Sequence, residues 1–202
     1  ETKARREAFY KQVDQATFDT ELEAQPQKKE KSISRVSPYV RGTIDDLLLE
    51  AIHAHNNGEL DRAIAIYSQI LASDPVPAVP VLAVIHKHRG MAYFAKGDYD
   101  NALQDFVASV QYDDKAFRSY YYIGIVYSVK NQHEKAVEAF TKSIELNKFQ
   151  SHAHYRRAIS HYKLGQDTDA LADLSAAEQL GLEDEDCSAL KAKIVAKVGM
   201  KM

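Results

Sequence analysis

The regular spacing of small residues is the feature that most constrains how this chain can fold. Ala102, Ala136 and Ala170 follow one another at equal intervals. Each is followed four positions later by a bulky apolar side chain: Phe106, Phe140 and Leu174. A constant period of about 34 residues is typical of stacked helical hairpins, in which each repeat buries its apolar face against the next.

An earlier, less regular copy of the pattern precedes these three. Ala63 and Tyr67 occupy the equivalent places, but the interval from Ala63 to Ala102 exceeds the later intervals by five positions. The surplus falls near Pro75, Pro77 and Pro80, and three closely spaced prolines exclude regular helix there. We therefore expect either a longer loop or an extended first turn before the second repeat, with Pro80 as its first helical residue.

The pattern divides the chain into three parts. Residues 1–41 form an N-terminal extension, residues 42–182 hold four repeats, and residues 183–202 hold a C-terminal helix. The repeats are predicted at 44–75, 83–116, 117–150 and 151–182. The last helix, from about Glu183 to Lys197, has apolar residues four apart at Leu190, Ile194 and Val198 and should cap the stacking face of the final repeat.

The N-terminal extension differs from the repeats in composition. Apolar residues four apart, such as Phe9 and Val13, predict a helix over about residues 2–24. A polar linker follows, and residues 33–40 should be extended because Pro38 disfavours helix at Ser37.

Composition narrows the class of protein. The chain has 202 residues with a net charge of −3, so it lacks the basic excess of nucleic-acid-binding domains. No stretch shows the alternation of β-strands, which indicates an all-α fold. No stretch has the 18 consecutive apolar residues of a membrane span, although the chain begins at Glu1 and leaves room for an anchor upstream. The compartment stays undetermined: the composition favours the cytoplasm, and a membrane-anchored or periplasmic location remains open.

These repeats resemble the tetratricopeptide repeat family. The resemblance covers residues 44 to about 198 and rests on the small residues at Ala51, Gly90, Gly124 and Ala158 together with the alanines and rings described above. It implies a right-handed α-solenoid in which the first helix of each repeat lines a concave groove that holds a peptide or helix of another protein.

Projecting the family's groove positions onto this sequence gives a set of candidate partner-binding residues on the first helices of repeats two to four. They are Lys87, Met91, Phe94, Arg118, Tyr121, Ile125, His152, Tyr155, Arg156, Ile159 and Tyr162. Within the run of three tyrosines, we expect Tyr120 in the core, Tyr121 in the groove and Tyr122 at the interface between repeats. Aromatic residues and arginine often carry interface energy.

Other motifs in the sequence do not support a specific ligand or a metal site. The clamp with which some family members hold a terminal carboxylate is matched only in part, so we do not predict an acidic chaperone tail as ligand. Histidines two apart, such as His86 and His88, point to opposite sides of a helix and should not hold a metal ion. The basic run Arg156-Arg157 is expected on the solvated surface, and Cys187 is expected as a small apolar residue on a helix.

Two functions remain open at this point. The first is a protein–protein interaction scaffold or adaptor that binds a partner's peptide or helix in the groove. The second is a structural protein, self-assembling as a homo-oligomer or autoinhibited, whose N-terminal extension docks in its own groove or a neighbour's. No nucleotide-binding loop, nucleophile motif or paired carboxylates appear, so we predict no enzyme activity, no cofactor and no metal.

Overall fold

The computed structural model describes residues 43–199, and all regular structure in this range is helical. Its helices are α2 (Ile44–Asn56), α3 (Leu60–Leu71), α4 (Val79–Lys96), α5 (Tyr99–Tyr112), α6 (Phe117–Val129), α7 (His133–Leu146), α8 (Ser151–Lys163), α9 (Asp167–Gln179) and α10 (Glu185–Gly199). The predicted N-terminal helix at residues 2–24 and the rest of the extension lie outside the described residues.

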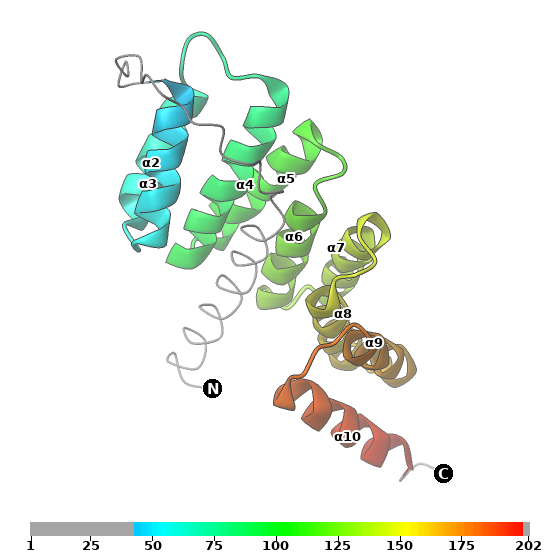
Figure 1. The fold of residues 1–202 in the computed structure, drawn as a ribbon. Coiled ribbons are helices and arrows are strands. Elements are labelled where there is room, and N and C mark those ends of the chain that lie inside the picture. The colour runs from blue at the N-terminus through cyan, green and yellow to red at the C-terminus, as the bar shows by residue number, and fades with distance from the viewer. Residues whose placement is uncertain (1–42, 200–202) are drawn as a thin grey trace, which may run out of the picture. The chain divides into compact units, whose positions relative to one another are not determined.

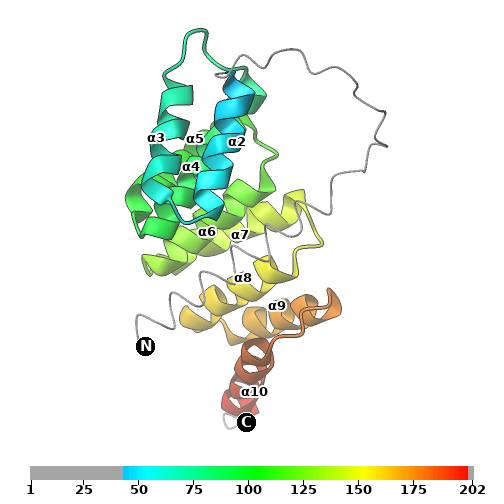
Figure 2. The same ribbon diagram turned by 60° about the vertical axis from the view of Figure 1, so that its left-hand side comes forward.

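The helices associate in consecutive pairs. α2 packs against α3, α4 against α5, α6 against α7 and α8 against α9, and each pair also packs against the first helix of the next one (Figure 1). A second view shows the same succession, with α10 following α9 at the C-terminal end (Figure 2). This is the predicted solenoid of four helical hairpins with a C-terminal cap.

A residue with positive φ ends the first helix of each pair. Gly97 closes α4 with φ 81°, and its backbone N–H donates to Phe94 O at 2.9 Å. Pair three has no glycine here, and Asn131 takes the left-handed conformation with φ 58°. Asparagine tolerates this conformation better than other side chains, so the turn is preserved without glycine.

Close approach within pairs two and three depends on glycine. A Cβ atom at Gly124 would lie 2.6 Å from Cδ1 and Cε1 of Phe140, and one at Gly90 would lie 2.9 Å from Cε1 of Phe106. The rings of Phe106 and Phe140 are fully buried. The small residue on the first helix therefore makes room for the ring on the second, as the sequence pattern predicts.

The five additional residues before pair two are taken up by a longer α4 and a longer loop before it. α4 begins at Val79, with Pro80 as its second residue, and spans 18 residues, against 13 for α6 and α8. Residues 72–78 link α3 to α4, whereas only residues 113–116 link α5 to α6, so both of the expected alternatives are observed. Pro80 is accommodated because the N–H groups of a first turn have no helical partner.

Aromatic rings join pair two to pair three. The ring of Tyr122 on α6 stacks on Phe106 of α5 with centroids 5.1 Å apart, which matches the predicted interface position of Tyr122. Tyr120, expected in the core, is partly exposed, whereas Tyr121, expected in the groove, is only 5% exposed. Tyr121 contacts Phe140 across its own pair, at 5.9 Å between centroids, so Tyr121 is the tyrosine that belongs to the core of pair three.

The C-terminal helix completes the core of pair four. Cys187 and Ile194 of α10 are fully buried in a cluster with Ala158 and Leu174. Burial raises the pKa of the Cys187 thiol, with smaller contributions from nearby acidic groups. Cys187 is therefore a small packed residue on a helix, as expected.

Candidate partner-binding surface

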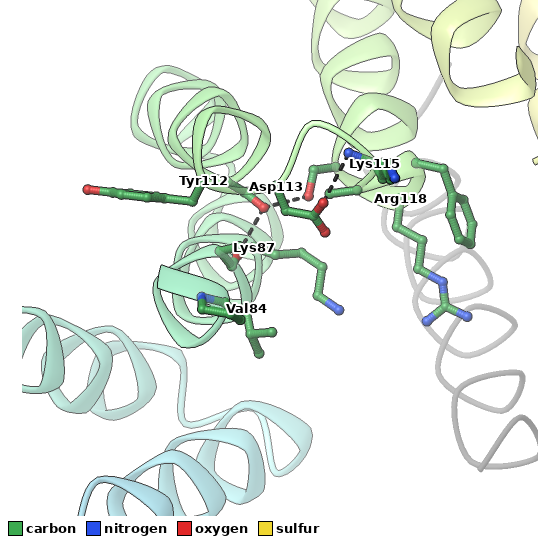
Figure 3. Close-up of a pocket in the computed structure, with 12 residues that line it drawn as sticks. Val84, Lys87, Tyr112, Asp113, Lys115 and Arg118 are labelled. Atoms are coloured by element: carbon green, nitrogen blue, oxygen red, sulfur yellow. Dashed lines mark hydrogen bonds between the residues drawn. The ribbon is translucent and has the colours of Figure 1, made fainter. Parts of the chain in front are cut away.

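A pocket opens where the first turns of α4 and α6 meet the end of α5. Its volume is about 560 Å³, within the range of about 300–1,000 Å³ usual for ligand sites. Figure 3 shows Lys87 of α4 and Arg118 of α6 extending toward the same space from the two helices. Both belong to the predicted partner-binding set, so the fold brings these two residues together.

The floor of the pocket is held by a hydrogen-bonded serine pair. Ser109 Oγ donates to Ala83 O at 2.9 Å, and the hydroxyls of Ser109 and Ser119 lie 2.8 Å apart. Both serines are buried. These hydrogen bonds connect the end of α5 to α4 and α6, the three helices that line the pocket.

The wall combines positive charge with apolar surface. Lys87, Lys115 and Arg118 contribute three cations, and Asp113 is the one acid among the described residues that line the pocket. The apolar part consists of Pro80, Ala83, Val84, Tyr112, Ala116 and Phe117.

On α4, the predicted residues fall into two groups. Lys87 and Met91 are partly exposed, whereas Phe94 is only 3% exposed. The Phe94 ring packs against Tyr99 at 5.5 Å and against Tyr122 at 6.4 Å between centroids. Phe94 thus contributes to packing within pair two and to its junction with pair three.

On α6, Arg118 is partly exposed and Ile125 is 3% exposed. Cζ of Arg118 lies 5.5 Å from the ring centroid of Phe117, a cation–π contact that holds the guanidinium beside the pocket. Ile125, like Tyr121, is therefore a packed residue.

On α8, the apolar candidates differ from their predicted placement. Tyr155, Ile159 and Tyr162 belong to or pack against the core cluster that includes α10. Burial, with a smaller contribution from Asp184, raises the pKa of Tyr155 to about 12. The physical reason is that α10 occupies the place a further repeat would fill, so the face of α8 that was projected onto the groove is covered.

The polar candidates on α8 remain nearer to solvent. His152 is exposed and Arg156 is partly exposed. Partial desolvation of the imidazole and, to a smaller extent, the charge of Arg156 lower the pKa of His152. Cζ of Arg156 lies 5.8 Å from the Tyr155 ring centroid.

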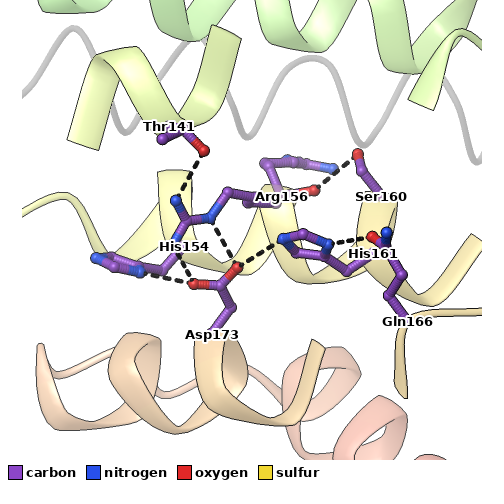
Figure 4. A network of polar contacts seen from close by, with 8 residues as sticks. Thr141, His154, Arg156, Ser160, His161, Gln166 and Asp173 are labelled. Atoms are coloured by element: carbon purple, nitrogen blue, oxygen red, sulfur yellow. Dashed lines mark hydrogen bonds and ion pairs between the residues drawn. The ribbon is translucent and has the colours of Figure 1, made fainter. Parts of the chain in front are cut away.

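A buried carboxylate in pair four was not predicted. Asp173 of α9 is 5% exposed and accepts hydrogen bonds from Arg157 Nε at 2.8 Å and Nη2 at 2.7 Å, with His154 Nδ1 at 3.1 Å (Figure 4). Arg157 Nη1 also donates to Thr141 Oγ1 of the preceding pair at 2.9 Å. Arg157, expected on the solvated surface, therefore links α7, α8 and α9.

The same arrangement occurs two repeats earlier, in pair two. Asp105 accepts from Arg89 Nε and Nη2 and from His86 Nδ1, all at 2.8 Å, and Arg89 Nη1 donates to Ser68 Oγ at 2.9 Å. Burial raises the pKa of Asp105, but the hydrogen bonds from Arg89 and His86 outweigh it and hold the net pKa below the ordinary value. A sequence signal was available, because the His, Arg and Asp recur together at twice the repeat period.

His86 and His154 hydrogen bond to buried carboxylates on the second helices of their pairs. Within residues 43–199, no three His, Cys, Asp or Glu side chains gather closely enough to hold a metal ion. No helix in the same range is both long and apolar enough to cross a membrane.

The fold and this surface define the class: an α-solenoid of helical hairpins whose first helices carry a mixed cationic and apolar pocket. The family model described as "Tetratricopeptide repeat" matches residues 87–150 and 124–181. The chain belongs to the tetratricopeptide repeat family.

The chain is similar in sequence to one further protein and similar in fold to two solved structures. The photosystem I assembly protein Ycf3 of Cuscuta gronovii is 32% identical over 117 residues, which cover 55% of this chain and 70% of the relative. MamA residues 41 to the end from Desulfovibrio magneticus RS-1 superimposes with a TM-score of 0.62 at 20% identity, covering 72% of this chain and 79% of that one. The first repeat domain of Spaghetti (RPAP3), bound to the HSP90 peptide SRMEEVD, gives a TM-score of 0.58 at 19% identity and covers 59% and 95%.

Proposed function

We propose that this chain is a protein–protein interaction scaffold that binds a peptide or helix of a partner on the face formed by its first helices. The observation that carries the proposal is the pocket between α4 and α6, which Lys87 and Arg118 enter from successive repeats. A ligand lying across this junction would contact two repeats at once. No catalytic role forms part of the proposal.

The binding mechanism is geometric and electrostatic. The helical hairpins present a stiff surface, so a partner segment is the component that must become ordered on binding. Met91 and the apolar pocket wall supply area to bury, while Lys87, Arg118 and Arg156 favour acidic or polar ligands over basic ones.

The similar proteins support a scaffold that binds a protein partner. One similar protein carries the name photosystem I assembly protein, and one similar structure holds a peptide of another protein. Both descriptions concern those proteins, and we extend to this chain only the binding of a peptide of another protein.

The test is partner capture with variants of the proposed surface. Full-length chain is immobilised, a partner is identified by mass spectrometry, and its binding is remeasured with Lys87→Glu, Arg118→Glu and Arg156→Glu. Lys142→Glu is the matched control, because Lys142 is exposed on α7, a second helix. The proposal expects weaker capture by the first three variants and unchanged capture by the control; equal capture by all four would refute it.

The alternative function, self-assembly through residues 1–41, lies outside the described residues and predicts a different result. A self-assembling chain would show, by light scattering, a mass that is a multiple of its 22.7 kDa. A monomeric mass at all concentrations tested would eliminate the homo-oligomer.

A further inference from the structure

We infer that the α4–α6 pocket takes an internal acidic segment of a partner protein in which a large apolar side chain lies next to carboxylates. The inference rests on the proposed function and assigns a ligand chemistry to one part of the proposed surface. It also adds Lys115, which the sequence-based set of candidate residues does not contain.

Charge complementarity identifies the acidic part of the ligand. The three cations come from different elements: Lys87 from α4, Lys115 from the loop between α5 and α6, and Arg118 from the first turn of α6. Among the described lining residues the single acid is Asp113, which accepts a hydrogen bond through Oδ1 from the backbone N–H of Lys115 at 3.0 Å. Asp113 therefore orders the loop that carries Lys115, and the described lining residues carry more positive than negative charge.

The size and the wall identify the apolar part. A volume of about 560 Å³ is far more than one carboxylate needs, so a whole side chain and its neighbours fit. Val84 is 39% exposed, and Pro80, Ala83, Ala116 and Phe117 continue the apolar lining. An aromatic or long aliphatic side chain can pack against this apolar surface. The Tyr112 ring stacks on His86 at 5.6 Å between centroids and extends away from Lys87 and Arg118 (Figure 3).

The surroundings favour a carboxylate of a side chain over one at a chain terminus. Lys87, Lys115 and Arg118 come from three separate elements, so they can bind several carboxylates spaced along a segment. We therefore commit to an internal segment as the occupant.

The probe is a capped twelve-residue peptide with one phenylalanine flanked on each side by two aspartates in a glycine–serine background. Its binding to the full-length chain is followed by fluorescence anisotropy. Three comparison peptides replace the aspartates by asparagine, replace the phenylalanine by alanine, or carry a free C-terminal carboxylate with no aspartate. We expect saturable binding of the first peptide with a Kd below about 1 mM and at least tenfold weaker binding of the other three.

Variants of exposed lining residues locate the site. Lys115→Glu should weaken binding by about tenfold, which corresponds to about 1.4 kcal/mol, because it replaces an attraction with a repulsion. Val84→Ser should weaken binding by removing apolar wall. Lys142→Glu on α7 should leave binding unchanged, and circular dichroism checks that each variant is folded.

The outcomes separate this inference from the proposed function. Absence of peptide binding, equal binding of the neutral peptide, or full binding by Lys115→Glu would overturn the inference. If partner capture still depends on Arg118 and Arg156 under those conditions, the scaffold function stands without this ligand chemistry. If the free-carboxylate peptide binds best, a chain terminus is the ligand and the committed occupant is wrong.

Discussion

The buried carboxylate of Asp105 makes the sharpest stability prediction. Asp105→Ala removes the acceptor of three hydrogen bonds, from two nitrogens of Arg89 and one of His86, all at 2.8 Å. The alanine leaves a guanidinium and an imidazole without their acceptor in a largely buried site. Removing one partner of such a buried pair costs about 3–5 kcal/mol in other proteins.

The expected loss lies near the lower end of that range. The side chains of Arg89 and His86 are 20% and 15% exposed, so water reaches them in part once the carboxylate is gone. We expect Asp105→Ala to lower the free energy of unfolding by about 3 kcal/mol. That is a large share of the stability of about 5–15 kcal/mol typical of folded domains.

The control is another aspartate of the same helix. Asp100 pairs with Lys130, but its side chain is 80% exposed. A pair this exposed is worth about 0–1 kcal/mol, so Asp100→Ala should change stability by no more than about 1 kcal/mol. Both variants are compared with the unchanged chain by urea unfolding followed by circular dichroism, with attention to the slope because repeat arrays can depart from two-state unfolding.

A triple substitution separates the cost of an unpaired charge from the benefit of the pair. Pair three carries Tyr120, Ile123 and Ala139 at the places held by His86, Arg89 and Asp105 in pair two. Introducing His86→Tyr, Arg89→Ile and Asp105→Ala together replaces the whole ion cluster by residues this fold already accepts.

Well-packed apolar replacements of a buried ion cluster are often neutral or stabilising by about 1–4 kcal/mol. The triple variant should therefore recover most of the loss that Asp105→Ala alone causes. A single variant no worse than Asp100→Ala, or a triple variant as damaged as the single one, would refute this reasoning.

Two further predictions concern packing and pH. Gly124→Ala should destabilise the chain by about 1–2 kcal/mol in thermal unfolding. The new Cβ would lie 2.6 Å from the Phe140 ring, and this overpacking outweighs the better helix propensity of alanine. Gly90→Ala should cost less, because its Cβ would lie 2.9 Å from the Phe106 ring. Burial lowers the pKa of His55 below its ordinary value of 6.5, so the unfolded chain binds a proton more readily, and stability should fall as the pH drops from above 6.5 through the folded-state pKa. His55→Gln should flatten that dependence, and an unchanged slope would contradict the assignment.

The repeat period was sufficient to predict the architecture because it encodes local geometry. A small residue on one helix and a ring on the next are required wherever two helices approach closely, and Gly124 with Phe140 meets this requirement directly. Helix ends also followed local chemistry, as at Gly97. The exact start of α4 was missed because proline is compatible with either a loop or a first helical turn.

The candidate surface was predicted less completely. Phe94, Tyr121 and Ile125 of the interior pairs are packed against neighbouring residues, and at pair four the projection treats the last repeat as an interior one. Pair four is the last, and α10 covers part of its first helix, including Tyr162, whose ring centroid lies 5.5 Å from Nζ of Lys193 and 5.4 Å from Nζ of Lys197. Only contacts between elements distant in sequence reveal such coverage. Lys115 was missed for a different reason: it lies in a loop, where the projection assigned no groove position.

The buried ion clusters were missed because a search at one period averages over features that occur in alternate repeats. The arginine of each cluster reaches back to a hydroxyl of the preceding pair, from Arg89 to Ser68 and from Arg157 to Thr141. The interface between pairs one and two and the interface between pairs three and four are therefore polar at this point.

The interface between pairs two and three replaces both partners together. Val107, one repeat period before Thr141, takes the place of the hydroxyl, and Ile123, one period after Arg89, takes the place of the arginine. Stacking the pairs in a wrong order would set an arginine against Val107 and leave a buried N–H unpaired, at a cost of about 1–3 kcal/mol, more for a charged group. Because the four hairpins share one repeat pattern, this alternation of polar and apolar interfaces gives the chain a physical means of selecting a single stacking order, and with it a single arrangement of Lys87 and Arg118 around the pocket.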